Sequence, residues 1–214
     1  MKVLLTGFDP FGGEAVNPAL EVVRQLDGAV IANAAVVTRE IPTVRGKAIE
    51  ALVRAIQEVQ PTVVIAVGQA GGRMDITPER VAINVDDFRI PDNEGNQVVD
   101  EEIAAEGPAA YWSTLPIKKI VAVLREEGIP ASVSNTAGTF VCNHVFYGLM
   151  HYLQQEGNIR RGGFIHVPYL PAQAAKLTGQ PSMALEVLVR GLRRAVEVAV
   201  TTHKDEKHGG GAIC

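Results

Sequence analysis

The chain has 214 residues, of which 47% are hydrophobic and 21% are charged, and its formal net charge at pH 7 is −4. This length is typical of one α/β domain, and it is sufficient to bury a large core without a disulfide or a metal. The acidic balance and the single Trp exclude an extended basic or base-stacking surface, so we expect no nucleic-acid partner.

The lack of a recognisable targeting signal and the use of cysteine predict a cytoplasmic protein. No run approaches the ~18 uninterrupted apolar residues of a membrane span, so we expect no membrane association. The first residues turn polar at Thr6 and lack the small-residue cleavage site of a signal peptide. Of the two cysteines, Cys142 and Cys214, the second ends a polar, glycine-rich tail, which argues against a disulfide framework and for a reducing compartment.

Short β-branched runs alternate with helical patterns, which is typical of helices packed on a mostly parallel sheet. Asn17 followed by Pro18 predicts the start of the first helix, because Asn is a favoured N-cap and Pro suits the first helical position. Up to residue 67, the pattern predicts strands at 2–6, 30–38 and 62–67 and helices after Asn17 and at 47–60.

A polar segment, 69–112, interrupts this alternation with many Gly, Asp, Asn and Pro residues. We expect a strand near 81–85 within it and then a long excursion, a feature that is often functional. The rest of the chain predicts helices at 116–128, 145–153 and about 182–200 and strands at 131–135 and 163–167. The sequence therefore predicts a single α/β domain over 1–200, followed by a flexible polar tail at 201–214.

The loop GFDPFGG at 7–13 follows the first predicted strand. Gly7 and Gly12 have the spacing of the two P-loop glycines, but Gly13 and Glu14 occupy the positions where a P-loop has Lys and then Ser or Thr. We therefore expect no nucleotide. Phe8 and Phe11 are two of the six phenylalanines in the chain. They either anchor the loop or form an apolar wall for a small ligand at the carboxyl end of the strand.

Cys142 lies in SNTAGTFVCNH at 134–144, where a predicted strand and a small-residue turn lead into a helix. A helix N-terminus lowers the pKa of a thiol through its aligned dipoles, and its free N–H groups can hold a developing oxyanion. By itself, a lone cysteine is more typical of a small buried hydrophobic residue.

A thiol nucleophile needs a base and a group that orients the base. His203 and His208 lie in the predicted tail, and His144 follows Cys142 too closely to point back at it. His166, in the strand GFIHV, is the strongest candidate base, although a core histidine with a structural partner fits the same pattern. Glu79, at the head of a strand, could orient it. No residues show zinc-ligand spacing, so we expect neither a metal nor another cofactor.

Six segments occur in order along the chain: TGFDPFGG, GGRxxITPERVAIN, RIPDNEG, STLPIKK, SNTAGTFVCNH and GFIHVPYLP. Together they resemble the motifs of the type I pyroglutamyl peptidases, or pyrrolidone carboxyl peptidases, from residue 1 to about 200. The resemblance implies one twisted sheet with helices on both faces and a homotetramer. It also implies a cytoplasmic cysteine peptidase that removes N-terminal pyroglutamate (5-oxoproline) from peptides. The tail with Cys214 matches no family motif.

The resemblance assigns roles motif by motif. It implies Cys142 as the nucleophile, His166 as the general acid and base, and Glu79 as the residue that orients His166. The pocket residues that it implies are Phe8, Phe11, Asn17, Gln69, Ile90, Phe140 and Val141, with Arg89 beside the thiol. An apolar slot suits a neutral lactam, and the cost of desolvating an ammonium group would reject ordinary N-termini.

Two other functions fit these residues. One is a Cys–His amidase that acts on other small lactams or free amides through the same triad, which a substrate panel would distinguish. The other is a non-catalytic α/β ligand-binding module in which Cys142 is buried and inert. Rapid, pH-dependent alkylation of the thiol would argue against the second function.

Overall fold

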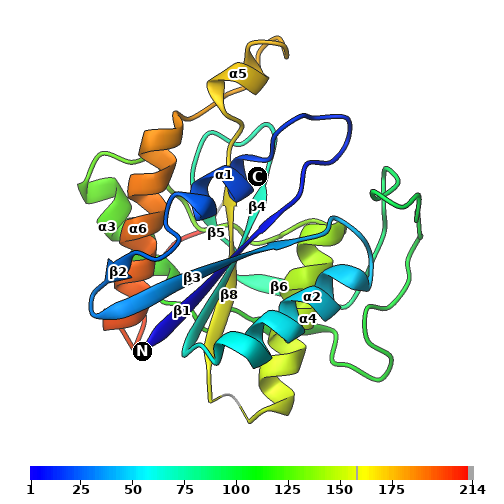
Figure 1. Ribbon diagram of the computed structural model, residues 1–214, viewed down its shortest axis with the longest axis horizontal. Helices are drawn as coiled ribbons and strands as arrows, with labels where there is room; N and C mark the ends of the chain where they lie inside the picture. Colours follow the sequence, from blue (N-terminus) through cyan, green and yellow to red (C-terminus); the bar gives the residue numbers. More distant parts are fainter. Residues whose placement is uncertain (158, 212–214) are drawn as a thin grey trace.

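The computed structural model describes residues 1–157 and 159–211. A six-stranded sheet forms its centre (Figure 1). From one edge to the other, its strands are β2 (Val30–Ile31), β3 (Ala34–Ile41), β1 (Lys2–Phe8), β4 (Val63–Gln69), β8 (Arg161–Val167) and β5 (Thr77–Pro78). The four inner strands are parallel, whereas β2 and β5 are antiparallel to their neighbours. The predicted mixed, mostly parallel sheet is confirmed.

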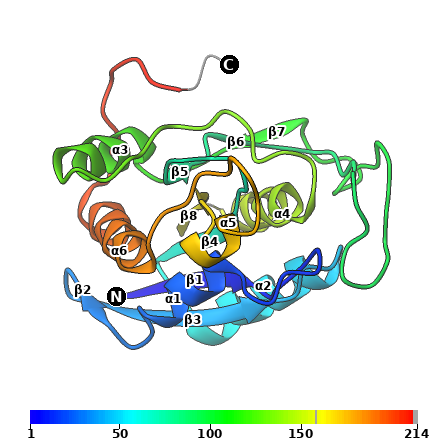
Figure 2. The same cartoon turned by 90° about the horizontal axis from the view of Figure 1, so that it is seen from above.

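Helices cover both faces of the sheet (Figure 2). One face carries α1 (Pro18–Arg24), α3 (Ile117–Glu126) and α6 (Leu185–Thr201), and the other carries α2 (Lys47–Val59) and α4 (Val141–Gln155). Alternate side chains of a strand point to opposite faces. Accordingly, Val3 and Leu5 of β1 join the apolar cluster under α1 and α6, and Leu4 joins the cluster under α2 and α4.

The first strand, β1, and the helix that follows it, α1, lie very close together. Asn17 caps α1, because its Oδ1 accepts the Ala19 N–H at 3.0 Å. Gly7 makes the close approach possible, since a Cβ at this position would lie 2.7 Å from the Leu20 Cα. The carboxyl end of β1 and the loop that follows it are therefore held directly against the start of α1.

The polar excursion contains elements too short to predict. The strands β6 (Val81–Ile83) and β7 (Ala110–Trp112) pair as a separate two-stranded sheet, and the loop between them extends to one side of the molecule (Figure 1). Asn84 anchors this loop, because its Oδ1 accepts the N–H groups of Ile103 and Ala104, both at 3.0 Å. The short helix α5 (Pro171–Ala174) follows β8. The predicted strand and excursion are confirmed, but β5, β7 and α5 carry too little periodicity to be detected.

Two predicted strands are wrong. The segment 30–38 is a hairpin of β2 and β3, because Ala32 and Asn33 form a two-residue turn with φ values of 47° and 62°. The segment 131–135 makes only isolated bridges to residues 76–79. Pro78 has no N–H to donate to the carbonyl of Ser132, so one hydrogen bond between the two segments is missing and no continuous strand pair forms.

Beyond α6, the described part of the tail runs beside α3 (Figure 2). The carboxylate of Asp205 accepts the N–H groups of Lys118 and Lys119 at 3.1 and 3.0 Å. The predicted tail extends to Cys214, and residues 212–214 lie outside the described residues.

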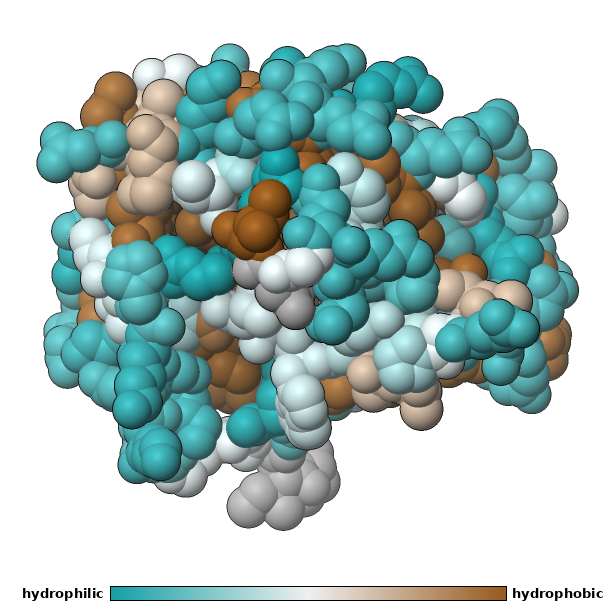
Figure 3. Space-filling model, turned by 90° about the horizontal axis from the view of Figure 1, so that it is seen from below, coloured by the Kyte–Doolittle hydropathy of each residue, from teal (hydrophilic) through white to brown (hydrophobic). Residues whose placement is uncertain are grey.

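The surface is mostly polar. Seen from below, hydrophilic residues cover most of the molecule, and apolar residues form separate spots (Figure 3). None of the helices in the described ranges is long and apolar enough to cross a membrane.

Candidate active site

The thiol and the candidate base meet at the carboxyl ends of the central strands. His166 is the penultimate residue of β8, and its register partner in β4 is Gly68. Cys142 is the second residue of α4, and a Cβ on Gly68 would lie 2.9 Å from its Sγ. The half-buried thiol therefore lies over β4, beside the strand that carries His166.

Glu79 approaches His166 from the edge strand. It directly follows β5, which pairs with β8 in a register that sets Thr77 opposite His166. His166 Nδ1 and Glu79 Oε1 are 2.7 Å apart, and both side chains are buried. Because Nδ1 is occupied, Nε2 is the only ring nitrogen left to act on a thiol. The structure thus brings together the three residues that the sequence motifs single out.

Arg73 is a member of this cluster that the sequence reasoning missed. Its Nη1 donates to Glu79 Oε1 at 2.6 Å and to Thr77 Oγ1 at 2.7 Å, and its Nη2 donates to the Thr136 carbonyl at 2.9 Å. Glu79 Oε2 is buried and has no hydrogen-bond partner among the described residues. A buried carboxylate needs a nearby cation. The sequence offered one signal for this role, because Arg73 lies six residues before Glu79 in the same motif.

Burial keeps the thiol and the imidazole neutral. Burial, together with the charge of Glu79, raises the pKa of Cys142 to about 12, against the opposing charge of Arg73. Burial, together with the charge of Arg73, lowers the pKa of His166, against the hydrogen bond and charge of Glu79, which raise it. The expected lowering of the thiol pKa at the helix N-terminus is wrong for the resting site, where the pKa is raised and burial is the largest cause.

Glu79 is the charged member of the group. Burial by itself would raise the pKa of Glu79, but the hydrogen bond from His166 and the charge of Arg73 lower it below its ordinary value. The site therefore holds an ionised carboxylate and a guanidinium beside a neutral thiol–imidazole pair, and it can stabilise an imidazolium that forms later.

The first turn of α4 offers main-chain N–H groups beside the thiol. Its N-cap, Phe140, makes no side-chain capping bond within the described chain, so these groups remain available to an anion. Asn143, the next residue after Cys142, fixes the turn in place. Its Nδ2 donates to the carbonyls of Ile83 and Val85 at 2.9 and 3.0 Å, and its Oδ1 accepts the Ile83 N–H at 3.0 Å.

All six phenylalanines make ring contacts around this site. They form two groups: Phe8, Phe146 and Phe164, and Phe11, Phe88 and Phe140. In the first group, the Phe164 ring lies 4.8 Å from the His166 ring, and Phe8 is part of the core. In the second, Phe11 and Phe140 are half-buried with ring centroids 6.1 Å apart. These two rings present an apolar surface near Cys142.

The other expected pocket residues differ in exposure and in their hydrogen-bond partners. Val141 is completely buried. Asn17 is also buried, and its Nδ2 donates to the Asp9 carbonyl at 3.1 Å, so its amide holds the first loop. Gln69 Oε1 accepts a hydrogen bond from Gln173 Nε2 at 3.0 Å. Beyond Phe88, Arg89 is exposed and Ile90 is half-buried.

A cavity of about 420 Å³ opens beside Arg73, between segments 72–77 and 132–136. It borders the cation of the charged cluster, and neither phenylalanine group lines it. No group of three or more His, Cys, Asp or Glu side chains could hold a metal ion in the part of the chain that the structure describes.

A thiol at a helix N-terminus beside a buried, carboxylate-oriented imidazole is the arrangement of a cysteine peptidase or amidase. The profile of the pyroglutamyl peptidase family matches residues 1–202. The pyrrolidone-carboxylate peptidase of Klebsiella pneumoniae (strain 342) is 61% identical over 210 residues, which are 98% of each chain. The pyrrolidone-carboxylate peptidase 1 of Ralstonia nicotianae is 61% identical over 211 residues, which cover 99% of this chain and 98% of the relative.

Solved structures show the same similarity. The crystal structure of pyroglutamyl peptidase I from Bacillus amyloliquefaciens has a TM-score of 0.95 and 54% identity, covering 97% of this chain and 99% of that one. A mutant (A199P) pyrrolidone carboxyl peptidase from Pyrococcus furiosus has a TM-score of 0.92 and 46% identity, covering 94% and 99%. The chain belongs to the pyroglutamyl peptidase family.

Proposed function

We propose that this enzyme removes N-terminal pyroglutamate from peptides, with Cys142 as nucleophile, His166 as general acid and base, and Glu79 as the residue that orients His166. The observation that carries the assignment is the 2.7 Å contact between His166 Nδ1 and Glu79 Oε1, which leaves Nε2 for the neighbouring thiol. The activities named for the relatives support the substrate.

The first step forms the acyl-enzyme. As Sγ attacks the carbonyl carbon that follows the lactam ring, Nε2 of His166 takes the thiol proton, so the ion pair is created during the reaction. Glu79 stabilises the imidazolium, and the N–H groups of the first turn of α4 hold the oxyanion. The C–N bond then breaks, and His166 gives its proton to the leaving amine.

The second step releases the product. A water molecule attacks the thioester carbonyl while His166 Nε2 takes its proton. The C–S bond breaks, the thiol recovers a proton from His166, and free pyroglutamate leaves. The resting neutral pair is restored.

Selectivity comes from the absence of charge on the lactam. Phe11 and Phe140 form the apolar wall, with Phe8 and Val141 behind them in the core and Ile90 and Arg89 at the edge. Gln69, held by Gln173, and main-chain groups supply hydrogen bonds to the lactam N–H and C=O. An N-terminal ammonium would lose its hydration here without a compensating anion, so ordinary N-termini bind poorly.

Hydrolysis of a pyroglutamyl fluorogenic amide, compared with the alanyl and prolyl amides, tests the proposal. We expect cleavage of the pyroglutamyl substrate alone and at least a ~10³-fold loss of turnover in Cys142→Ser. Near-normal activity of Cys142→Ser would overturn the nucleophile assignment. Faster cleavage of free lactam amides than of peptides would favour the amidase alternative, and an unreactive thiol would favour a binding module.

We also propose a homotetramer in the cytoplasm. The family resemblance supports the tetramer, and the need to keep a nucleophilic thiol reduced supports the compartment. Light scattering should give four times the chain mass of 22.9 kDa. A monomer at assay concentration would contradict the assembly, and a fractionation that recovers the enzyme outside the cytoplasm would contradict the location.

A further inference from the structure

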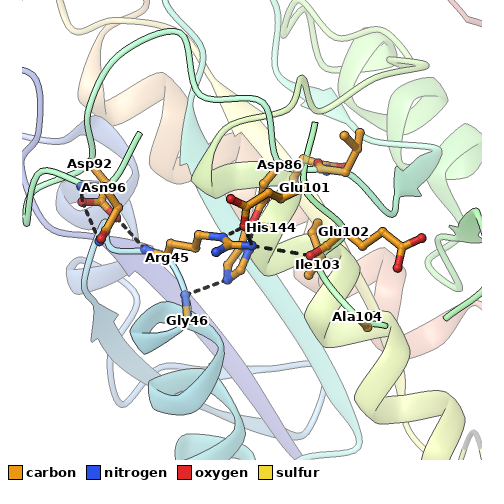
Figure 4. A network of polar contacts seen from close by, with 12 residues as sticks. Arg45, Gly46, Asp86, Asp92, Asn96, Glu101, Glu102, Ile103, Ala104 and His144 are labelled. Carbon is orange, nitrogen blue, oxygen red and sulfur yellow. Dashed lines mark hydrogen bonds and ion pairs between the residues drawn. The ribbon is translucent and has the colours of Figure 1, made fainter. Parts of the chain in front are cut away.

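His144, two residues after Cys142, forms a second buried histidine–carboxylate pair with Asp86 (Figure 4). His144 Nδ1 and Asp86 Oδ2 are 2.8 Å apart, and both side chains are almost completely buried. The N–H of Gly46 donates to His144 Nε2 at 2.8 Å. Because a main-chain N–H can only donate, Nε2 accepts and Nδ1 carries the proton. His144 is therefore held in one tautomer, and neither ring nitrogen is free for the thiol.

Arg45 extends this pair into a network that joins three segments. Its Nε donates to Asp86 Oδ2 at 2.8 Å, and its Nη2 lies 2.9 Å from Glu101 Oε2. Its main-chain N–H donates to Asp92 Oδ2 at 2.8 Å. The network thus ties the start of α2 and the polar excursion to the first turn of α4 (Figure 4).

The segment 86–90 is held by residues that precede and follow Cys142 in the chain. After Cys142 in the chain, His144 holds Asp86. Before it, Thr139 holds the next residue of the segment, because its carbonyl accepts the Asp87 N–H at 3.0 Å and its Oγ1 donates to the Asp87 carbonyl at 2.8 Å. The Phe88 ring then packs edge-on against Phe140, with a centroid distance of 4.7 Å.

Folding alone does not explain the buried carboxylate. Asp86 Oδ1 has no hydrogen-bond partner in the described ranges, although the side chain is completely buried. An apolar pair of similar size would often be at least as stable as an incompletely satisfied buried polar cluster. Such a cluster is found most often where a site needs a fixed geometry.

We propose that His144 and Asp86 are positioning residues, which set the distance between Cys142 and the pocket wall at 87–90. This inference rests on the proposed function, because it assumes that Arg89 and Ile90 border the lactam site. The pair does not contact the thiol. Loss of the pair should therefore weaken substrate binding and leave the intrinsic reactivity of Cys142 unchanged.

The test compares His144→Leu, His144→Asn and the control His151→Leu. Asn keeps a donor near the position of Nδ1 for Asp86 and loses the acceptor for Gly46. His151 lies on the same helix, and its Nδ1 is 2.8 Å from the Tyr111 hydroxyl, so its loss removes a comparable contact away from the site. The readouts are kcat and KM for the pyroglutamyl amide and the rate of Cys142 alkylation by iodoacetamide.

We expect His144→Leu to raise KM on the order of tenfold, the effect of about 1.4 kcal/mol, with kcat and the alkylation rate within about threefold of the parent. His144→Asn should recover part of the KM, and His151→Leu should match the parent. An unchanged KM, or an equal fall in alkylation and kcat, overturns the inference. If His144→Leu fails to fold, the KM of His144→Asn is compared with that of His151→Leu. A higher KM for His144→Asn supports the inference, and equal values contradict it. Failure of the parent enzyme to cleave the amide instead overturns the proposed function.

Discussion

Arg73 gives the buried site its electrostatic balance. It is the cation that opposes burial and the Glu79 charge at the thiol, and it binds the same carboxylate oxygen as His166. In the proposed mechanism, this neutral thiol, with a pKa of about 12, must give up its proton as it attacks. The charge of Arg73 therefore lowers the free energy of the thiolate that forms during the reaction.

Replacement of Arg73 tests this role at the level of the thiol. In the parent enzyme without substrate, alkylation of Cys142 should rise about tenfold per pH unit from pH 7 to 9, because the thiolate fraction rises in that way below the pKa. Arg73→Gln should slow alkylation at every pH in this range, and Arg73→Lys should restore most of the rate because it keeps the charge.

Arg80→Gln is the matched control for Arg73. Arg80 follows Glu79 directly, but its Nε donates to Asn135 Oδ1 at 2.8 Å. Its loss removes a neighbouring positive charge without opening the Glu79 contact, so alkylation should stay within about twofold of the parent rate. A rate that is independent of pH above 7 in the parent would mean that the thiolate already exists at rest, which would contradict the neutral pair.

The pKa shifts of His166 and Glu79 also predict acid sensitivity of the fold. The pKa of His166 is lowered from 6.5, so the unfolded chain binds a proton more readily, and stability falls as the pH drops below 6.5. The pKa of Glu79 is lowered from 4.5, so its contribution is present above 4.5 and is lost as the pH falls through the lowered value. Urea unfolding between pH 8 and 4 measures the His166 window, and its extension to lower pH measures the Glu79 window. His166→Asn should flatten the curve around pH 6, and an unchanged slope would contradict the shift.

Among the elements, the contact of β1 with α1 allows the least change. A methyl group at Gly7 would meet the backbone of Leu20 at 2.7 Å, whereas one at Gly191 of α6 would meet side chains alone, the nearest atom being the Cδ1 of Ile76 at 2.4 Å. A side-chain end can move aside, but a helix backbone cannot. Gly7→Ala should cost ~3 kcal/mol of unfolding free energy and Gly191→Ala clearly less, measured by urea denaturation. Equal costs would mean that α1 can shift away from the sheet.

The sequence predicted long elements well and short ones poorly. Helices such as α2 and α6 carry several turns of apolar periodicity, so their burial follows from their own residues. The two-residue β2 and β5 depend on what lies beside them. The hairpin at 30–41 was missed because positive φ at Ala32 is rare for its residue type.

The same distinction applies to the site. The motifs that carry Cys142, His166 and Glu79 can be recognised in the sequence. In contrast, Asp86 and His144 are far apart in the sequence and come into contact only in the fold. Asp86 and His144 are 58 positions apart. Neither lies in a pattern that identifies its partner, because the pairing follows from how the excursion crosses the start of α4.

At the scale of the whole molecule, the tail is connected to the domain through Asp205. Its carboxylate takes the place of an N-cap for α3, which begins at Ile117 after a proline that makes no capping bond among the described residues. Asp205→Ala should lower the unfolding free energy by ~1 kcal/mol. Asp205→Asn, which keeps an acceptor oxygen, should recover part of the loss. Removal of residues 202–214 should cost no less than Asp205→Ala. No effect of either change would mean that the tail is detached in solution.

The position of β8 between β4 and β5 has a consequence for synthesis on the ribosome. β4 and β5 leave the exit tunnel long before residues 161–167, so one edge of β4 stays unpaired until most of the chain has been made. The same late strand delivers His166 to Glu79. A nascent chain therefore already carries the thiol but has no imidazole beside it. Under the proposed mechanism, the thiol has no base until β8 is inserted between β4 and β5, so the ability to cut peptides arises only with the nearly complete fold.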